Sequence, residues 1–350
     1  MISPVLSVVV TCYNLEHYIG ASLKSALDQR DAGNFEIIVV DDSSTDGSVN
    51  VIRSTPGVRL IEMPENGGVL LAMLAGVDAA QGDIVCLLDG DDLWSPTKLR
   101  EIRAAFEADP AAGLVTHDLT FMDENGVSDG RTSRSSNVFA ALPESCYEEV
   151  VRDGILAHTD YVWLGSALSI RRSSMRWCEF AIWARALPYP RDTYQDWPLA
   201  YWCASMPDVA LVYVDQPLLK YRLHHANHSG DTRTASKALR NFTRARNTLA
   251  AERSIISMKG LGPDYYRLIS HRIALLNAQI ALYAGQRLLA ITRLVRVLPR
   301  LSLRLAGKEI LRFAVGVLIG PERMAKGLSS RKMFPSGSNL DSSLTHRARS

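Results

Sequence analysis

The first 90 residues alternate between short apolar runs and longer amphipathic stretches, with short connections between them. The apolar runs, rich in β-branched residues and typical of buried strands, are residues 6–12, 35–42, 58–63 and 83–89. The stretches with helical spacing are residues 16–29, 44–54 and 66–82. This alternation predicts an α/β fold, a mostly parallel Rossmann-like sheet with helices on both of its faces.

The pattern becomes looser after residue 113. The segments expected to be strands are 113–127, which includes a turn, and 165–172, 209–215 and 218–224. A helix is expected over 197–205, where Pro198 suits the first turn. Residues 128–150 are expected to be a polar loop, and 173–195 are expected to be a loop without a readable pattern. From residue 233 onward the chain has helical spacing and is basic.

The net charge of +2 conceals two oppositely charged halves. Residues 1–232 carry 17 Lys and Arg against 32 Asp and Glu, a net charge of −15. Residues 233–350 carry 22 against 5, a net charge of +17. Two functions are therefore expected. We predict a catalytic domain over 1–232, a basic helical region over 233–330, and a disordered tail over 331–350.

The compartment is predicted from the cysteines and from the apolar runs. The five cysteines are scattered and form no C-x-x-C pair, which favours reduced thiols over a disulfide framework. The N-terminal apolar run lacks a preceding basic region and is typical of a strand rather than a signal peptide. No run of about 18 apolar residues predicts a membrane-spanning helix. A cytoplasmic protein is expected.

Acidic side chains gather where two of the predicted strands end. Asp89, Asp91 and Asp92 follow one strand, and Asp41 and Asp42 follow another. Because ligands of parallel sheets bind at the carboxyl ends of the strands, these acids are expected at one site. A solvated turn with a helix N-cap is the alternative, and it accounts for one aspartate better than for three. Carboxylates suit Mg²⁺ or Mn²⁺, which in turn bind substrate phosphates.

Five motifs carry a resemblance to a known family. They are "VVVTCYN" (8–14), "IIVVDDSSTDGS" (37–48), "ENGGV" (65–69), "LLDGDDLWSP" (87–96) and "YQDWPLAYWCA" (194–204). In this order and spacing the chain resembles glycosyltransferase family 2 over about residues 5–230. The resemblance implies the glycosyltransferase-A fold and an inverting, metal-dependent transfer of sugar from a nucleoside-diphosphate sugar, with UDP as the expected nucleotide.

The resemblance also implies roles for residues of the nucleotide-sugar site. Thr11, Tyr13 and Asp42 would hold the base, with Asp41 nearby. Asp89 and Asp91 match the family's D-x-D motif, which grips ribose and the Mn²⁺ or Mg²⁺ ion. The remaining candidates for the metal are Asp92, which is the adjacent acid, and His224, which matches a histidine near the diphosphate or metal in many relatives. A surface turn is the alternative for His224, and more so for its neighbours His225 and His228.

An acceptor hydroxyl needs a general base. Asp196 matches the acid of the family's "ED" element, the catalytic base of inverting members, while Gln195 stands where that element usually has Glu. An N-cap role is the alternative for Asp196. The acceptor is expected to be a glycan or a lipid-linked sugar of a surface polysaccharide. Trp163 and Trp197 flank the expected acceptor side. Each could pack in the core or stack on a sugar ring of the acceptor, and both roles remain open.

The chain departs from the family at one further position. Relatives often carry an arginine toward the pyrophosphate after "GGV", where this chain has Met73 and Leu74. Methionine supplies no charge. A compensating cation is therefore needed, for which Arg171 and Arg172 are the candidates, or the diphosphate is bound more weakly.

The basic half mixes Leu, Ile and Val with arginines at helical spacing over 272–320. Such helices lie on anionic membrane surfaces, so a peripheral location on the inner face of the membrane is expected. The alternative is a helical bundle that packs on itself, on the catalytic domain or in a homo-oligomer. Nucleic acid is not expected as a partner, because aromatic residues interleaved for base stacking are missing.

Two other functions compete with the glycosyltransferase. A sugar-1-phosphate nucleotidyltransferase is also α/β and metal-dependent, but it usually begins with a Gly-rich basic phosphate loop, which "VVVTCYNLEHY" lacks. A catalytically inactive glycosyltransferase fold could act as a membrane scaffold. Gln195 and Met73 favour that alternative, and the intact acids at 42, 89, 91, 92 and 196 oppose it.

Overall fold

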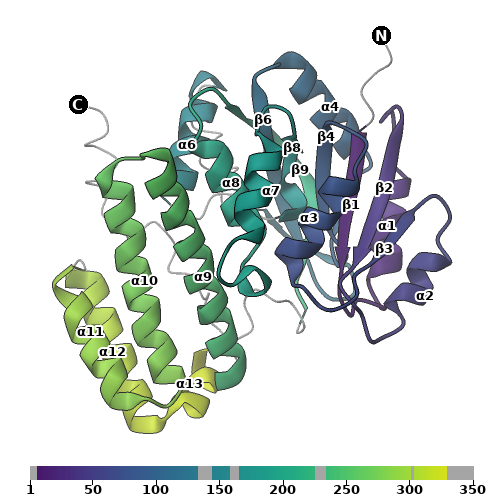
Figure 1. Ribbon diagram of the computed structural model, residues 1–350. Coiled ribbons are helices and arrows are strands. Elements are labelled where there is room, and N and C mark those ends of the chain that lie inside the picture. Colours follow the sequence, from purple (N-terminus) through teal and green to yellow (C-terminus); the bar gives the residue numbers. More distant parts are fainter. Residues whose placement is uncertain (1–5, 133–143, 158–164, 225–233, 301–302, 329–350) are drawn as a thin grey trace. The chain divides into compact units, whose positions relative to one another are not determined.

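The computed structural model describes residues 6–132, 144–157, 165–224, 234–300 and 303–328 (Figure 1). The chain divides into two compact units. The first comprises residues 1–156 and 161–224, and the second comprises 157–160 and 225–350. The predictions made for Trp163, His225, His228 and the segment 331–350 lie outside the described residues.

The first unit is built on one nine-stranded sheet with the order β3-β2-β1-β4-β8-β6-β9-β5, in which β7 pairs with β6. Its strands are β1 (Leu6–Cys12), β2 (Phe35–Asp41), β3 (Arg59–Glu62), β4 (Ile84–Asp89), β5 (Leu93–Trp94), β6 (Ala112–Met122), β7 (Ser128–Thr132), β8 (Ser169–Arg171) and β9 (Ala210–Arg222). Its α-helices are α1 (Ile19–Leu27), α2 (Ser48–Arg53), α3 (Val69–Ala79), α4 (Lys98–Ala108), α6 (Tyr147–Leu156), α7 (Trp177–Arg185) and α8 (Asp196–Ala204). The 3₁₀ turns are η1 (Glu144–Cys146), η2 (Gly165–Ala167) and η3 (Pro190–Asp192).

The N-terminal half of the sheet is parallel. Strand β1 is buried along its whole length and pairs in parallel with β2 and β4, as its continuous β-branched run predicts. The register places Cys12 opposite Asp41 and Thr11 opposite Asp89. The carboxyl ends of the three strands therefore lie at one level of the sheet, and the acids that follow them share one edge.

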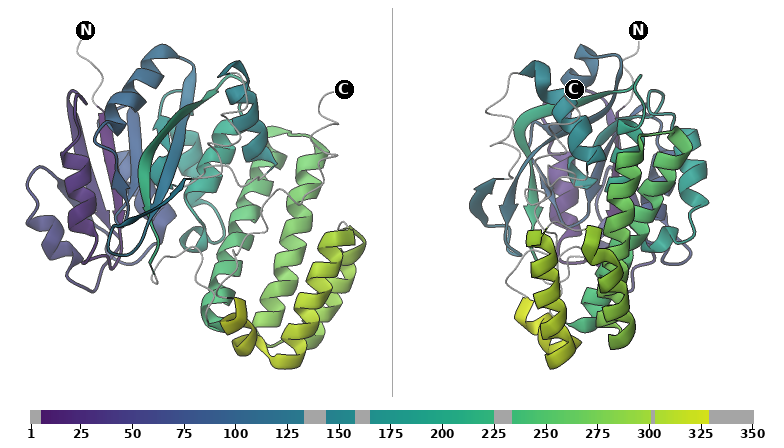
Figure 2. Two further views of the ribbon diagram at one scale, coloured as in Figure 1. Left: turned by 180° about the vertical axis from the view of Figure 1, so that it is seen from behind. Right: turned by 90° about the vertical axis from the view of Figure 1, so that its left-hand side faces the viewer.

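Helices cover both faces of this half, as Figures 1 and 2 show. On one face Val8 belongs to the core cluster that contains Leu23 of α1 and Phe106 of α4. On the other face α3 packs so closely that a β-carbon on Gly76 would lie 2.3 Å from a methyl carbon of Val9. Alternate residues of β1 thus face opposite helical layers, and the expected α/β fold is confirmed.

The second half of the sheet is mixed rather than parallel. Strand β8 runs antiparallel to β4, so that Arg171 lies opposite Ile84 at the start of β4. Strand β9 is one continuous strand from Ala210 to Arg222, where the sequence pattern predicted two. It pairs in parallel with β6, and an irregularity in the register near Pro217 lets the strand continue past that residue.

Two of the expected loops are wrong. Within 128–150, the described residues form β7 and then enter η1 and α6, whose apolar side chains Val151 and Ile155 are buried. Within 173–195, the segment "WCEFAIWAR" forms α7 and buries Trp177 and Phe180. Helix α7 has aromatic residues at helical spacing. It was not predicted because the segments on either side of it are polar or contain proline.

The second unit is helical, as the basic half of the sequence predicts. Its elements are α9 (Ala235–Lys259), α10 (Pro263–Tyr283), α11 (Arg287–Val297), the 3₁₀ turn η4 (Leu298–Arg300), α12 (Leu303–Ile319) and α13 (Pro321–Leu328). Its core contains Phe242, Leu282, Tyr283, Leu294 and Phe313. Across the described segments, no helix has both the length and the hydropathy that a membrane span requires.

Candidate active site

The carboxyl edge of the sheet brings the predicted acids together. Thr11 Oγ1 donates a hydrogen bond to Asp89 Oδ1 at 3.0 Å, which joins the ends of β1 and β4. The Asp42 amide donates to the Cys12 carbonyl at 2.8 Å, which joins the ends of β1 and β2. Tyr13, the next residue after β1, is half-buried. The residues expected around a nucleotide therefore lie on three neighbouring strands.

Asp42 is held by the glycine turn before α3. Its Oδ1 accepts from the Gly67 amide at 2.6 Å and its Oδ2 from the Gly68 amide at 2.9 Å. Burial raises the pKa of Asp42, while these two amides and the nearby Arg191 charge lower it. Gly68 has φ +84°, and a β-carbon there would lie 2.2 Å from the Arg191 carbonyl oxygen. Only glycine allows this approach.

Asp41 is almost completely buried beside Asp42. Its Oδ2 accepts a hydrogen bond from the Ser44 amide at 2.8 Å. Its Oδ1 is a buried oxygen with no hydrogen-bond partner among the described residues. A buried acceptor without a partner favours a site that receives a hydrogen bond from a ligand. In a solvated turn, water would satisfy this oxygen.

The three acids of the "DGDD" turn have different surroundings. Asp89 is half-buried, and burial followed by the charge of Asp91 raises its pKa to about 6. Asp91 Oδ2 lies 3.0 Å from His224 Nε2. Asp92 is completely buried, and its Oδ1 accepts from the Arg222 amide at 2.9 Å. Burial and the two neighbouring acids raise the pKa of Asp92 well above its usual value.

Two buried basic side chains support this turn from the protein interior. Arg222 Nε donates to the Asp91 carbonyl at 2.7 Å. Lys98 Nζ donates to the Ser166 carbonyl at 2.7 Å and lies 2.8 Å from His117 Nε2. Burial lowers the pKa of Lys98 to about 7. Lys98 was not among the residues predicted for the site, because its partners lie far away along the chain.

The hydroxyl of Ser166 links this support to the strand edge. Its Oγ accepts a hydrogen bond from the Asp89 amide at 2.9 Å, while its carbonyl accepts from Lys98. The Trp94 indole nitrogen donates to the same carbonyl at 3.1 Å, and the Lys98 ammonium lies 4.3 Å from the centre of the Trp94 ring. The backbone around Asp89 is therefore fixed by a buried network.

Gln195 connects α8 to the acids. It is buried, and its Nε2 donates to Asp89 Oδ1 at 2.7 Å. Asp196 follows it as the first residue of α8 and is half-buried, with its Oδ1 accepting from the Trp197 amide at 2.9 Å. The candidate base is thus one residue away from the contact with Asp89. Trp197 is also half-buried in this turn.

Part of the chain matches a known protein family. Residues 7–147, about two fifths of the chain, match the family model described as glycosyl transferase family 2. This segment is similar to that family. The chain is 32% identical to the succinoglycan biosynthesis protein ExoO of Rhizobium meliloti over 163 residues, 45% of each chain. It is 35% identical over 96 residues, 27% of this chain and 38% of the relative, to WfaP of Escherichia coli, a UDP-Glc:alpha-D-GlcNAc-diphosphoundecaprenol beta-1,3-glucosyltransferase.

A solved structure supports the expected fold. TarS of S. aureus has a TM-score of 0.52 and 15% identity, covering 93% of this chain and 55% of that chain. This likeness shows a shared glycosyltransferase-A fold. The alignments with the two curated relatives span less than half of their lengths. The comparisons therefore show a likeness to glycosyltransferases over part of the chain, and the activity and substrates of the whole protein are matters for proposal.

The arginines expected to replace the missing cation of the family 2 motif do not lie at this site. Arg171 donates to the Phe106 and Pro110 carbonyls at the end of α4, and Arg172 donates to the Ala80 carbonyl after α3. Both lie beside the amino ends of the strands, so this prediction is wrong. Met73 is completely buried, as a side chain in the core should be.

Arg191 is the basic side chain that sequence reasoning missed at the family 2 site. It is exposed, it lies on η3, and its charge lowers the pKa of the nearby Asp42. Its backbone carbonyl is the atom that approaches Gly68. Arg191 lies in a segment whose sequence has no readable pattern, so the sequence did not indicate that it would lie near Asp42.

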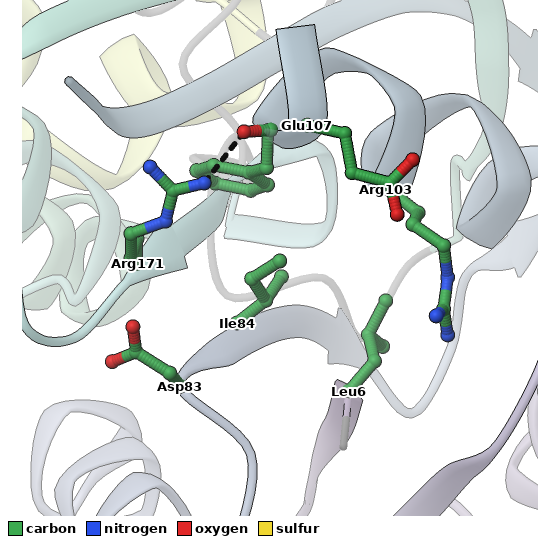
Figure 3. A pocket seen from close by; sticks show the side chains of 7 residues that line it. Leu6, Asp83, Ile84, Arg103, Glu107 and Arg171 are labelled. Atoms are coloured by element: carbon green, nitrogen blue, oxygen red, sulfur yellow. Dashed lines mark hydrogen bonds between the residues drawn. The ribbon is translucent and has the colours of Figure 1, made fainter. Parts of the chain in front are cut away.

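Figure 3 shows a small cavity at the opposite end of the sheet. It has a volume of about 100 Å³ and is lined by Leu6, Ile84 and charged side chains that include Arg171. Leu6 and Ile84 are the first residues of β1 and β4. The cavity is therefore separated from the family 2 site by the full length of these strands.

The carboxyl edge of the sheet offers donors for a divalent cation. In the part of the chain that the structure describes, no three His, Cys, Asp or Glu side chains are arranged around a common metal position. Asp91 and His224 nevertheless form a close pair of oxygen and nitrogen donors, and Asp91 is partly exposed. Mg²⁺ commonly takes one or two protein carboxylates and completes its shell with substrate phosphates and water. The Asp91 carboxylate fits such an ion, with the imidazole of His224 beside it.

Proposed function

We propose that this protein is an inverting, metal-dependent glycosyltransferase that moves a sugar from a UDP-sugar to a hydroxyl acceptor in surface glycan synthesis. The observation that carries the proposal is the hydrogen bond from Gln195 to Asp89, 2.7 Å long. It fixes the first turn of α8, and with it Asp196, beside the acids at the end of β4. The proposed binding site for the sugar donor and the candidate general base are thereby neighbours.

The nucleoside is proposed to bind at the ends of β1 and β2. Thr11, Tyr13 and Asp42 line this position, and the buried Asp41 Oδ1 is an acceptor for a donor group of the base or ribose. Asp42 acts mainly by holding the Gly67–Gly68 turn, because both of its oxygens already accept backbone amides. UDP is the proposed nucleotide because the name of WfaP gives UDP-Glc as its donor.

Asp91 and His224 are proposed to hold Mn²⁺ or Mg²⁺, with Asp89 between them and the nucleoside. The ion would neutralise the negative charge that develops on the departing nucleoside diphosphate. Asp92 is proposed to position the turn rather than to touch the ion, since it is completely buried and bound to the Arg222 amide. Arg191 would supply a further positive charge for the diphosphate.

Asp196 is proposed to take the proton from the acceptor hydroxyl as that oxygen attacks the anomeric carbon. Attack from the side opposite the leaving diphosphate inverts the configuration of that carbon. The acceptor is proposed to be a lipid-linked sugar, because WfaP is named for a diphosphoundecaprenol acceptor. Trp197, half-buried in the same helical turn as Asp196, offers an aromatic ring to the sugar.

The test is transfer by the purified full-length protein from a panel of UDP-sugars to diphosphoundecaprenol-linked acceptors. Asp196→Asn should lower the rate by about 10²–10⁴-fold while leaving UDP-sugar binding within about twofold. Asp208→Asn is the matched control, because Asp208 is an exposed partner of Arg176 in a surface ion pair. A wild-type rate for Asp196→Asn, or a product that retains the donor's anomeric configuration, contradicts the mechanism.

A further inference from the structure

Exposed apolar side chains are concentrated on two helices of the second unit. Among the described residues, nine of the sixteen large apolar side chains that are exposed lie on α11 and α12. The other seven are scattered over the rest of the described chain. Single exposed apolar residues are ordinary on a protein surface, but a concentration of this kind marks an interaction surface.

On α11 the exposed apolar residues form one stripe. Leu288, Ile291 and Val295 follow the spacing i, i+3, i+7, and Leu288 is 84% exposed. Residues at this spacing lie on one face of a helix. The opposite face carries Ala290 and Leu294, which are buried in the core of the unit. The helix therefore has an apolar face that no described residue covers, in addition to the one that packs.

On α12 the exposed stripe is longer. Its large side chains are Ile310, Leu311, Val315, Leu318 and Ile319. Leu311 is 66% exposed and Leu318 is 80% exposed. At 1.5 Å per residue the stripe runs for about 14 Å. The side chains that α12 buries are Glu309 and Phe313, on the other side of the helix. Figure 1 shows α11 and α12 beside α10.

The charges around these stripes are positive. Residues 287–328 carry nine Lys and Arg and two Glu, a net charge of +7. On α11, Arg287 and Arg296 are both exposed. At 100° per residue they lie about 90° to either side of the Leu288 stripe. An apolar centre with basic flanks is the arrangement of a helix that lies in the interface of an anionic membrane, with its arginines at the lipid phosphates.

We propose that the exposed apolar stripes of α11 and α12 are a docking surface for an anionic lipid membrane. The aliphatic side chains enter the boundary between headgroups and acyl chains, and the basic flanks contact the anionic headgroups. This function is separate from sugar transfer and does not depend on it. It would hold the protein at the surface where a lipid-linked acceptor is found.

Charge and apolar content disfavour the other occupants of these stripes. Pairing the stripes with those of a second copy would bring two regions of net charge +7 together. The segment 329–350 contains only Met333, Phe334, Leu340 and Leu344 as large apolar residues, too few to cover nine aliphatic side chains. An anionic lipid surface is complementary to both the apolar and the basic parts.

The test is flotation of the full-length protein with vesicles of phosphatidylcholine alone or mixed with phosphatidylglycerol. The wild-type protein should float with the anionic vesicles and at least tenfold less with the neutral ones at low salt. Leu311→Glu/Leu318→Glu should weaken binding at least tenfold, because it places charge in the stripe. Arg287→Gln/Arg296→Gln should weaken it about tenfold and reduce its dependence on salt.

Controls separate docking from folding and from self-association. Ile182→Glu, at an apolar residue 71% exposed on α7, should float like the wild type. The leucine variants should keep the wild-type helical circular dichroism, since both side chains are exposed. Equal flotation with neutral and anionic vesicles, or wild-type binding by Leu311→Glu/Leu318→Glu, overturns the proposal. A wild-type dimer that this variant converts to a monomer, without vesicle binding by either, assigns the stripes to self-association instead.

Discussion

Replacing Gln195 with glutamate tests the contact that joins α8 to the acids. In the structure Gln195 Nε2 donates to Asp89 Oδ1 at 2.7 Å, and Asp89 has a pKa raised to about 6. Gln195→Glu replaces the donor with a second acceptor of nearly the same shape. Two unit charges 2.7 Å apart repel by about 6 kcal/mol at an effective dielectric constant of about 20. The pair should therefore keep one shared proton.

The sign of the effect follows from the proton that the pair retains. An unfolded chain loses its glutamate proton near pH 4.3, so above pH 6 the folded variant binds one proton more than its unfolded state. A raised carboxyl pKa gives stability that is lost as the pH rises. The free energy of unfolding of Gln195→Glu should fall by about 1.4 kcal/mol per pH unit. Because the raised pKa of Asp89 already gives the wild type a small part of this fall, the loss relative to the wild type should be about 2 kcal/mol between pH 6 and 8.

The assay is urea unfolding in EDTA at pH 6, 7 and 8, followed by tryptophan fluorescence. All six tryptophans lie in the first unit, so the signal reports the unit that contains the site. Gln195→Met removes the same hydrogen bond without adding charge, and its loss of stability should not change across this interval. If Gln195→Glu and Gln195→Met have the same pH dependence, the contact with Asp89 is refuted.

Three further predictions use the same protein. Gly68→Ala should destabilise the first unit by about 3 kcal/mol in urea unfolding, because of its positive φ and the clash with Arg191, whereas Gly67→Ala should cost less. The pKa of Lys98, lowered to about 7, predicts that wild-type stability rises with pH between about 7 and 10, and Lys98→Met should abolish that rise in the same assay. Removing divalent cations should abolish sugar transfer, with Mn²⁺ restoring it, and Asp91→Asn should weaken Mn²⁺ binding measured by calorimetry.

The parallel half of the sheet could be predicted from the sequence because its signal is local. The run "LSVVVTC" (6–12) is a strand with the predicted bounds, and Asp41 and Asp89 end their strands as expected. A buried parallel strand needs nothing but continuous apolar residues, and its polar end marks the strand edge. The position of the acids at one edge then follows from the parallel order alone.

The direction of a strand is not a local property, and this explains the error at Arg171. The segment 165–172 was recognised as a strand, but its pattern is the same whether it runs parallel or antiparallel. Because β8 runs antiparallel to β4, its last residue lies opposite Ile84 at the amino end of the sheet. Arg171 is therefore carried away from the site. The burial of Lys98 was hidden for a related reason, since His117 and Ser166 reach it through tertiary packing.

The "DGDD" turn places three acids close together, and their negative charges repel one another. Protein groups stabilise part of this charge, and a bound cation would stabilise the rest. Burial and the two neighbouring acids raise the pKa of Asp92 well above its usual value, which favours its protonated form, and its Oδ1 accepts from the Arg222 amide. Asp89 is held by neutral donors from Thr11 and Gln195. Asp91 is paired with His224, a side chain that can ligate a metal as readily as it can accept a proton. The charge left for an external cation is thus concentrated at Asp91 and Asp89, at the edge that faces the proposed diphosphate, and this is why a single divalent ion would be enough.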